Sequence, residues 1–148
     1  MIINGPSLNM LGIREPGIYG GASYEDLVEY IKKSVAEADA SDPRSETETL
    51  LDFRQSNHEG DLIDWIQEAW FEKYDGIVIN PAAYTHTSIA ILDALKAVAI
   101  PTVEVHLSDV DSREEFRRHS FVSLYAEKVI KGKGFDGYRE ALEHFSEK

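Results

Sequence analysis

Short apolar runs alternate with amphipathic stretches along most of the chain. The run 77–79 (Ile-Val-Ile) follows Asp75-Gly76 and is typical of a strand buried on both faces of a parallel sheet. Asn80-Pro81 ends it, because proline cannot donate to a strand ladder. Thr87 or Ser88 can then cap a helix that begins at about residue 89. This segment therefore predicts a strand, a loop and a helix, with Asn80 at the carboxyl end of the strand.

The same patterns predict the remaining elements. Strands are expected at 1–3, 50–55, 102–108 and 128–130, and helices at 24–38, 59–71, 89–98, 114–116 and 135–145. Apolar residues recur at helical spacing in three of these helices: Leu27, Val28, Ile31 and Val35; Leu62, Ile63, Ile66 and Trp70; Ile91, Leu92, Leu95 and Val98. Ser23 with Asp26, and Asn57, are the expected helix caps.

Alternation of strands and helices implies a parallel sheet covered by helices on both faces. We therefore predict an α/β fold, a flavodoxin-like three-layer sandwich with a five-stranded parallel sheet in the order 2-1-3-4-5. The polar stretch from Ser41 to Glu48 is expected to be a loop. The longer loop at about 8–21 contains Arg14 and Tyr19 among glycines and prolines, which favours a functional lid over a surface connection. The whole chain, 1–148, is expected to form one domain.

Composition narrows the class of protein. The sequence has 148 residues, a net charge of -12 and no cysteine. The charge argues against a nucleic-acid surface, and no apolar run reaches the roughly 20 residues that span a bilayer. Met1 leads almost directly into a strand, so we expect no signal peptide. The lack of cysteine fits a reducing cytoplasm, and an anionic substrate would need a local cluster of arginines.

Glu104 and His106 are the first candidates for chemistry. They share one face of the predicted strand 102–108, with Val103, Val105 and Leu107 on the other. A carboxylate in an inner strand is costly unless it is paired, and His106 is its nearest partner. The two residues form either a buried polar pair that only fixes the strand or a dyad in which His106 carries protons near neutral pH.

Arg113 and Arg117 lie four residues apart and are expected on one face of a short helix. Such a face is usually solvated and paired with neighbouring glutamates. It also follows the carboxyl end of a strand, so with Arg14 it can bind an anionic substrate. The five histidines have no metal-ligand spacing and no GxGxxG or GxxxxGK[ST] motif is present, so we expect neither a metal nor a nucleotide cofactor.

Several blocks together resemble the type II 3-dehydroquinate dehydratases. They are NGPSLNMLGIREPGIYGG, QSNHEG, INPAAYTHTS, EVHLSDVDSREEFRRHS and the late Gly137-Tyr138. The resemblance implies dehydration of 3-dehydroquinate to 3-dehydroshikimate through an enolate intermediate, without metal or Schiff base. It also implies a homo-oligomer, a dodecamer built of trimers, with a small-molecule substrate and no nucleic-acid or membrane partner. It leaves open whether the enzyme serves aromatic biosynthesis or quinate breakdown.

The resemblance assigns a role to each matching residue. Tyr19 would remove the C2 proton with Arg14 favouring its phenolate, Asn80 would position a water on the enolate oxygen, and His106, oriented by Glu104, would protonate the departing hydroxyl. The substrate-binding residues would be Asn80, His86, Asp93 of a neighbouring subunit, Leu107, Ser108, Arg113 and Arg117, with Arg113 latching the lid.

The sequence departs from the family's usual residues in five places: Ser7 for Asn, Ala82 for Gly, Asp111 for His, and Lys131 and Lys133 for apolar residues. None of these removes a proposed acid, base or enolate-stabilising residue. Two rival readings remain: a non-catalytic flavodoxin-like module that binds an anionic ligand or FMN, and a metal-dependent hydrolase.

Overall fold

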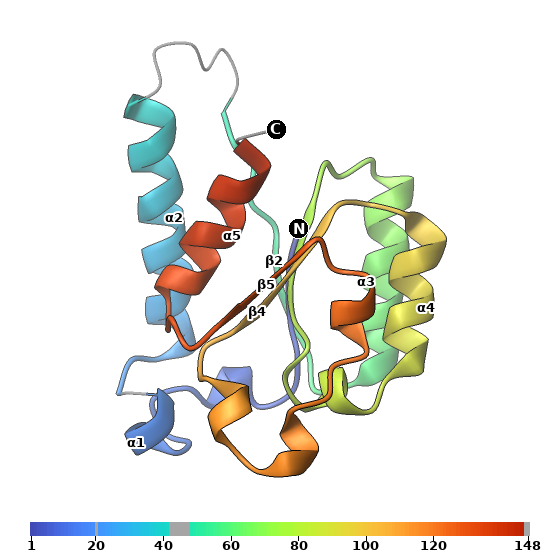
Figure 1. Cartoon of the computed structure of the whole chain (residues 1–148). Helices are drawn as coiled ribbons and strands as arrows, with labels where there is room; N and C mark the ends of the chain where they lie inside the picture. The colour runs from blue at the N-terminus through green and yellow to red at the C-terminus, as the bar shows by residue number, and fades with distance from the viewer. Residues whose placement is uncertain (20, 42–47, 147–148) are drawn as a thin grey trace.

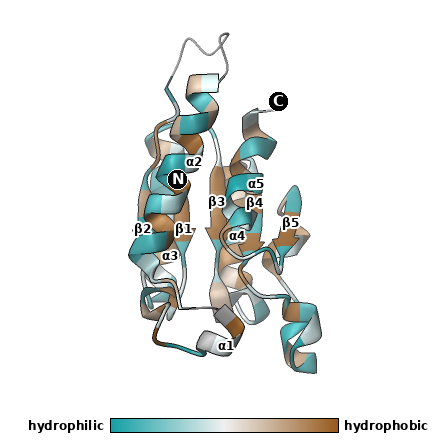
Figure 2. Ribbon diagram, turned by 90° about the vertical axis from the view of Figure 1, so that its left-hand side faces the viewer, coloured by the Kyte–Doolittle hydropathy of each residue, from teal (hydrophilic) through white to brown (hydrophobic). Residues whose placement is uncertain are grey.

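Five parallel strands form the centre of the molecule. A computed structural model describes residues 1–19, 21–41 and 48–146, without the side chains of Pro16 and Tyr19. Its strands are β1 (Ile2–Asn4), β2 (Phe53–Gln55), β3 (Ile77–Asn80), β4 (Thr102–His106) and β5 (Lys128–Lys131). Their order is β2-β1-β3-β4-β5 and every pair is parallel (Figure 2). The predicted flavodoxin-like topology is confirmed.

Two helices cover each face of the sheet (Figure 1). Helices α2 (Tyr24–Ser41) and α5 (Asp136–Ser146) lie on one face, and α3 (Glu59–Phe71) and α4 (Ile89–Val98) on the other. The described parts of the loops carry one short helix, α1 (Pro16–Tyr19), and five 3₁₀ turns: η1 (Leu8–Met10), η2 (Ala82–His86), η3 (Val110–Ser112), η4 (Glu115–Arg117) and η5 (Val122–Leu124).

Alternation along the strands divides the core into two layers. Ile3, Ile77 and Ile79 pack with Leu62 and Ile66 of α3 and with the apolar face of α4. Neighbouring strand residues point to the opposite face and pack against α2 and α5; they include Ile2, Val78, Val103 and Val105. Both faces of the inner strands are therefore buried, as their continuous apolar runs predict.

Two helix caps form as expected from the sequence. The backbone N–H of Ser23 donates to Asp26 Oδ2 at 2.8 Å, and that of Asp26 donates to Ser23 Oγ at 3.1 Å, which is a reciprocal cap of α2. Ser88, rather than Thr87, caps α4 by accepting from Ile91 N–H at 2.9 Å. These local signals fix where the helices begin.

Two expectations for α3 are wrong. Its N-cap is His58, not Asn57; the Asn57 side chain instead accepts the backbone N–H of Ser7 at 2.9 Å. Trp70 is 57% exposed, because the buried stripe continues from Ile66 to Ala69 and turns Trp70 away from the sheet. A tertiary contact and a small residue thus override the local pattern.

The carboxyl ends of the strands face the end of the molecule where α1 and the turns η1 to η4 gather (Figure 1). Most of the expected loop at 41–48 lies outside the described residues. Within the described part of the chain, no helix is long and apolar enough to cross a membrane.

Candidate active site

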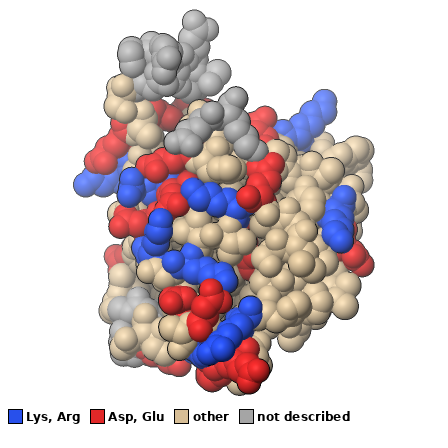
Figure 3. Space-filling model, viewed as in Figure 1, with Lys and Arg blue, Asp and Glu red and all other residues tan. Residues whose placement is uncertain are grey.

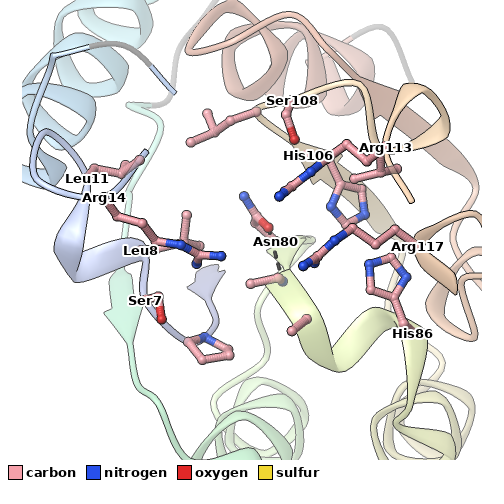
Figure 4. Close-up of a pocket in the computed structure, with 15 residues that line it drawn as sticks. Ser7, Leu8, Leu11, Arg14, Asn80, His86, His106, Ser108, Arg113 and Arg117 are labelled. Atoms are coloured by element: carbon pink, nitrogen blue, oxygen red, sulfur yellow. Dashed lines mark hydrogen bonds between the residues drawn. The ribbon is translucent and has the colours of Figure 1, made fainter. Parts of the chain in front are cut away.

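A pocket opens at the carboxyl ends of β1, β3 and β4 (Figure 4). This is the edge at which open α/β sheets bind ligands. Its walls come from four loops that follow strands or turns: Pro6, Ser7, Leu8, Leu11 and Arg14; Asn80, Ala82, Ala83 and His86; His106, Leu107, Ser108 and Val110; Arg113 and Arg117. The fold therefore brings together most of the residues selected from the sequence.

Three arginines point into this pocket from two sides. Figure 4 shows Arg14 across from Arg113 and Arg117, with the space before Asn80 and His106 between them. Glu15 lies 3.2 Å from Arg14 Nε and 3.6 Å from Arg113 Nη2, so it links the loop after β1 to the loop after β4. The result is a locally cationic site in an acidic protein, suited to a carboxylate-bearing ligand.

The expected single helix carrying both later arginines is absent. Arg113 ends η3 and Arg117 lies within η4, with an extended backbone at Arg113 and Glu114 between the two turns. Arg113 and Arg117 both line the pocket nevertheless, because η3 and η4 both lie over the carboxyl end of β4. Arg117 Nε is also paired with Glu114 at 2.8 Å.

Glu104 and His106 form a buried pair at the floor of the pocket. His106 Nε2 lies 2.7 Å from Glu104 Oε1, and the two residues are 4% and 0% exposed. Thr85 Oγ1 donates to Oε1 at 2.5 Å, and Ser120 Oγ lies 2.9 and 3.0 Å from the two carboxylate oxygens. Burial by itself would raise the pKa of Glu104, but the hydrogen bonds from His106, Thr85 and Ser120 outweigh it and hold that pKa below its ordinary value.

A second buried network fixes Asn80. Its Nδ2 donates to the hydroxyl of Tyr138 at 3.0 Å, its Oδ1 accepts from Ala82 N–H at 3.1 Å, and Tyr138 in turn donates to Asn4 Oδ1 at 2.5 Å. Burial raises the pKa of Tyr138, so this hydroxyl keeps its proton. The sequence places Tyr138 on the closing helix and in the late Gly-Tyr block, and gives it no further role. Nothing in the local pattern shows that α5 reaches across to β1 and β3.

His86 lies at the rim and is oriented by the chain behind it. Its Nδ1 is 2.7 Å from the carbonyl oxygen of His119, so Nδ1 carries the proton and Nε2 is left as the acceptor. Burial lowers the pKa of His86, and the charges of His106 and Arg117 act in the same direction. A neutral imidazole at this position is suited to accept a hydrogen bond from a ligand hydroxyl.

Two departures from the family's usual residues fall where the backbone is left-handed. Ser7 has φ 66° and Ala82 has φ 51°, a region that Gly and Asn enter most easily. Serine and alanine each cost about 1 kcal/mol there. Two other residues that differ from the family's usual ones, Asp111 and Lys131, form an ion pair in which Lys131 Nζ lies 3.0 Å from both carboxylate oxygens of Asp111. That ion pair ties the loop after β4 to β5.

The resemblance assigns roles to four further residues: Asp93, Tyr19, Leu107 and Ser108. Asp93 is exposed on α4 and is not among the pocket-lining residues of this chain. The side chain of Tyr19 lies outside the described residues, although its backbone ends α1 beside the pocket loop. Leu107 and Ser108 follow β4 directly and line the pocket. No group of three or more potential metal ligands gathers among the residues that the structure describes.

Fold and site together define a flavodoxin-like α/β protein with a small, cationic acid–base pocket at the carboxyl ends of its central strands. Comparison with known proteins makes this more specific. The sequence profile described as "Dehydroquinase class II" matches residues 1–146. The chain belongs to the class II dehydroquinase family.

Named relatives agree with this assignment. The 3-dehydroquinate dehydratase of Streptomyces avermitilis is 52% identical over 144 residues, which are 97% of this chain and 84% of that protein. The crystal structure of the type II dehydroquinase from Butyrivibrio crossotus superposes with a TM-score of 0.90 at 46% identity, covering 98% of this chain and 94% of that one. A type II dehydroquinase from Propionibacterium acnes gives a TM-score of 0.87 at 37% identity, with 99% and 94% coverage.

Proposed function

We propose that this chain is a type II 3-dehydroquinate dehydratase, a hydro-lyase that converts 3-dehydroquinate to 3-dehydroshikimate through an enolate intermediate without metal or Schiff base. The observation that carries the proposal is the hydrogen-bonded Glu104–His106 pair facing a pocket lined by three arginines. Such a site offers a proton carrier beside an anion-binding surface, which the elimination of water from a carboxylate-bearing substrate requires.

The base is assigned to Tyr19. A tyrosine has an ordinary pKa near 10, so a phenolate at neutral pH needs a nearby cation, and Arg14 of the same loop supplies one. The other tyrosines close to the strand ends do not suit this role. Burial raises the pKa of Tyr24 and of Tyr138, so both remain phenols.

Stabilisation of the enolate oxygen is assigned to a water molecule held by Asn80. The amide is fixed because Oδ1 accepts from Ala82 and one Nδ2 proton goes to Tyr138. The second Nδ2 proton is then available to orient a water in the pocket. A rigid donor aimed at the site where charge develops stabilises the intermediate without reorganisation.

The acid is assigned to His106. As the enolate collapses, the carbon–oxygen bond breaks, and the His106 proton joins the leaving hydroxide to form water. Leu107 and Ser108 hold the substrate carboxylate through backbone N–H groups, while His86 and Arg117 bind ring hydroxyls. The neutral state of His86 supports its part as an acceptor.

The segment 8–21 is assigned as a lid over this single catalytic domain. Arg14 lines the pocket from this segment, and the 3.6 Å ion pair between Glu15 and Arg113 supports a latch that holds it down. Trypsin cleavage after Arg14 measures the closure. Bound product should protect that peptide bond. Equal rates of cleavage with and without product would contradict the assignment of this segment as a lid.

We also assign a homo-oligomer built of trimers, a dodecamer, in which Asp93 completes a neighbouring site. Asp93 is exposed on α4, and Ile89 and Leu124 nearby are exposed apolar residues. The face over α4 and η5 carries few charged side chains (Figure 3). Light scattering at micromolar concentration tests this, and a monomer would contradict it. The absence of cysteine from the sequence supports a cytoplasmic location.

The decisive experiment is an ultraviolet assay for the conjugated enone that forms when 3-dehydroquinate is added to the purified protein. Activity should survive EDTA and should survive borohydride added with substrate. Loss with EDTA would favour a metal enzyme, and a substrate-dependent adduct on a lysine would establish a Schiff base. A yellow protein without dehydration activity would favour a flavin-binding module.

A further inference from the structure

Behind the Glu104–His106 pair lie two hydroxyl groups that do not line the pocket. Thr85 is fully buried on η2, and Ser120 lies between η4 and η5. They touch each other at 2.8 Å between Oγ1 and Oγ, and both contact the Glu104 carboxyl. Neither residue is among those that line the pocket, so their hydroxyl groups act on a ligand through the Glu104 carboxyl that they contact and not by direct contact.

Backbone contacts hold these hydroxyls in place. The N–H of Phe121 donates to the carbonyl of Thr85 at 2.8 Å, which joins the two segments. The N–H of Ser123 donates to Ser120 Oγ at 3.0 Å. Ser120 Oγ, which accepts this N–H, donates its own proton to the Glu104 carboxylate, whose oxygens lie 2.9 and 3.0 Å away, and Thr85 Oγ1 donates to the same carboxylate. The hydroxyl protons of the cluster therefore converge on the carboxylate.

The hydrogen-bond donors around Glu104 indicate which of the two residues carries the proton between Glu104 and His106. An ionised carboxylate only accepts, and it has about four lone-pair positions. Glu104 receives Thr85, Ser120 and the imidazole, which suits the ionised form. If Glu104 were protonated instead, the two hydroxyl donors would face a weaker acceptor in a buried site, which is unfavourable.

We propose that Thr85 and Ser120 are positioning residues that keep Glu104 ionised, so that the proton between Glu104 and His106 stays on Nε2. In the acid form of His106 both ring nitrogens carry a proton, and the proton on Nδ1 is the one delivered into the pocket, which leaves a neutral ring protonated on Nε2. This inference rests on the proposed function only in naming the proton's destination. The arrangement of Glu104, His106 and the two hydroxyls is independent of it. Among the described residues, the charged or titratable groups that face the pair include Arg113 and Arg117, which line the pocket with His106, and His86, which is bonded to the carbonyl of His119.

The kinetic test replaces the hydroxyl without changing the side-chain shape. Thr85→Val should lower kcat about tenfold, the worth of one hydrogen bond to a charged group, and leave KM within about twofold because Thr85 does not line the pocket. Thr85→Ser, which restores the hydroxyl, should return kcat close to the wild-type value. Thr87→Val is the matched control: Thr87 is exposed two residues further along the same segment, so both constants should stay unchanged.

Three kinetic results would overturn the proposal: a wild-type kcat in Thr85→Val, a rise in KM in place of the fall in kcat, or an equal loss in Thr87→Val. Thermal unfolding of each variant, with light scattering, checks that it is folded and assembled. If Thr85→Val does not fold, Ser120→Ala replaces it with the same expectation, because Ser120 contacts both oxygens of Glu104.

A spectroscopic test does not depend on catalysis. Magic-angle-spinning NMR of sedimented protein with ¹⁵N-labelled histidine should show neutral His106 protonated on Nε2, with its signals assigned by their loss in His106→Gln. With ¹³C-labelled glutamate, the pH at which Glu104 titrates should rise by about one unit in Thr85→Val. A neutral ring protonated on Nδ1, or an unchanged titration of Glu104, would refute the proposal. An inactive wild-type protein with the expected spectra would refute only the proposed function.

Discussion

Tyr138 joins two strand ends from a helix far away in sequence, and Tyr138→Phe tests how much that link contributes. Its hydroxyl is the donor to Asn4 Oδ1 and the acceptor for Asn80 Nδ2. All three residues are at most 3% exposed. Phenylalanine fills the same space, so the substitution removes two hydrogen bonds and little else.

The expected loss of stability follows from the groups left without partners. One carbonyl oxygen and one amide proton remain in a buried site, and each such group costs about 1–3 kcal/mol. Allowing for partial relaxation, the free energy of unfolding should fall by about 2–4 kcal/mol. With the urea dependence usual for a small domain, the unfolding midpoint should fall by about 1–2 M. Because Asn80 also loses an orienting contact, kcat should fall about tenfold.

Tyr125→Phe is the matched control. The Tyr125 hydroxyl donates one hydrogen bond, to the carbonyl of Ile100 at 2.9 Å, and Tyr125 does not line the pocket. It should lower the free energy of unfolding by about 1 kcal/mol and leave kcat unchanged. Both variants are compared by urea unfolding at one protein concentration, since assembly adds to apparent stability. Equal effects of the two substitutions on stability and turnover would show that the Tyr138 link is an ordinary hydrogen bond.

Three further outcomes are expected. Tyr19→Phe should abolish turnover while 3-dehydroquinate still binds, measured by calorimetry; substantial activity would remove Tyr19 as the base. His106→Ala should lower turnover by about 10²–10⁴, the usual contribution of a positioned general acid, and near-normal rates in the enone assay would reject that role. Lys131→Met frees the loop after β4 from its ion pair with Asp111 and should raise KM about two- to fivefold, consistent with a partly exposed pair. Lys133→Met is its control, since Lys133 pairs with Glu140 on α5, and an equal rise in KM there would contradict the argument.

Much of the architecture is determined locally. The apolar run of β3 and the proline that ends it, the reciprocal cap formed by Ser23 and Asp26, and the alternation in β4 each follow from a few neighbouring residues. These signals are strong because burial on two faces, or a cap, involves short segments with regular spacing. The Glu104–His106 pairing follows from these local signals, whereas the strand order follows from the flavodoxin-like fold that the alternation of strands and helices favours.

The tertiary structure decided what depends on segments far apart in the chain. The side chain of Asn57 binds the backbone N–H of Ser7 and does not cap α3. Trp70 faces outward because Ala69 continues the buried stripe of the helix. The two arginines after β4 reached the pocket from separate turns. Glu104 accepts hydrogen bonds from Thr85 and Ser120, which lie 19 and 16 residues away in the sequence. Asn80 donates a hydrogen bond to Tyr138, which lies 58 residues away. Hydrogen bonds of this kind have no periodicity in the sequence, since only the packing of one strand end against another element brings donor and acceptor together.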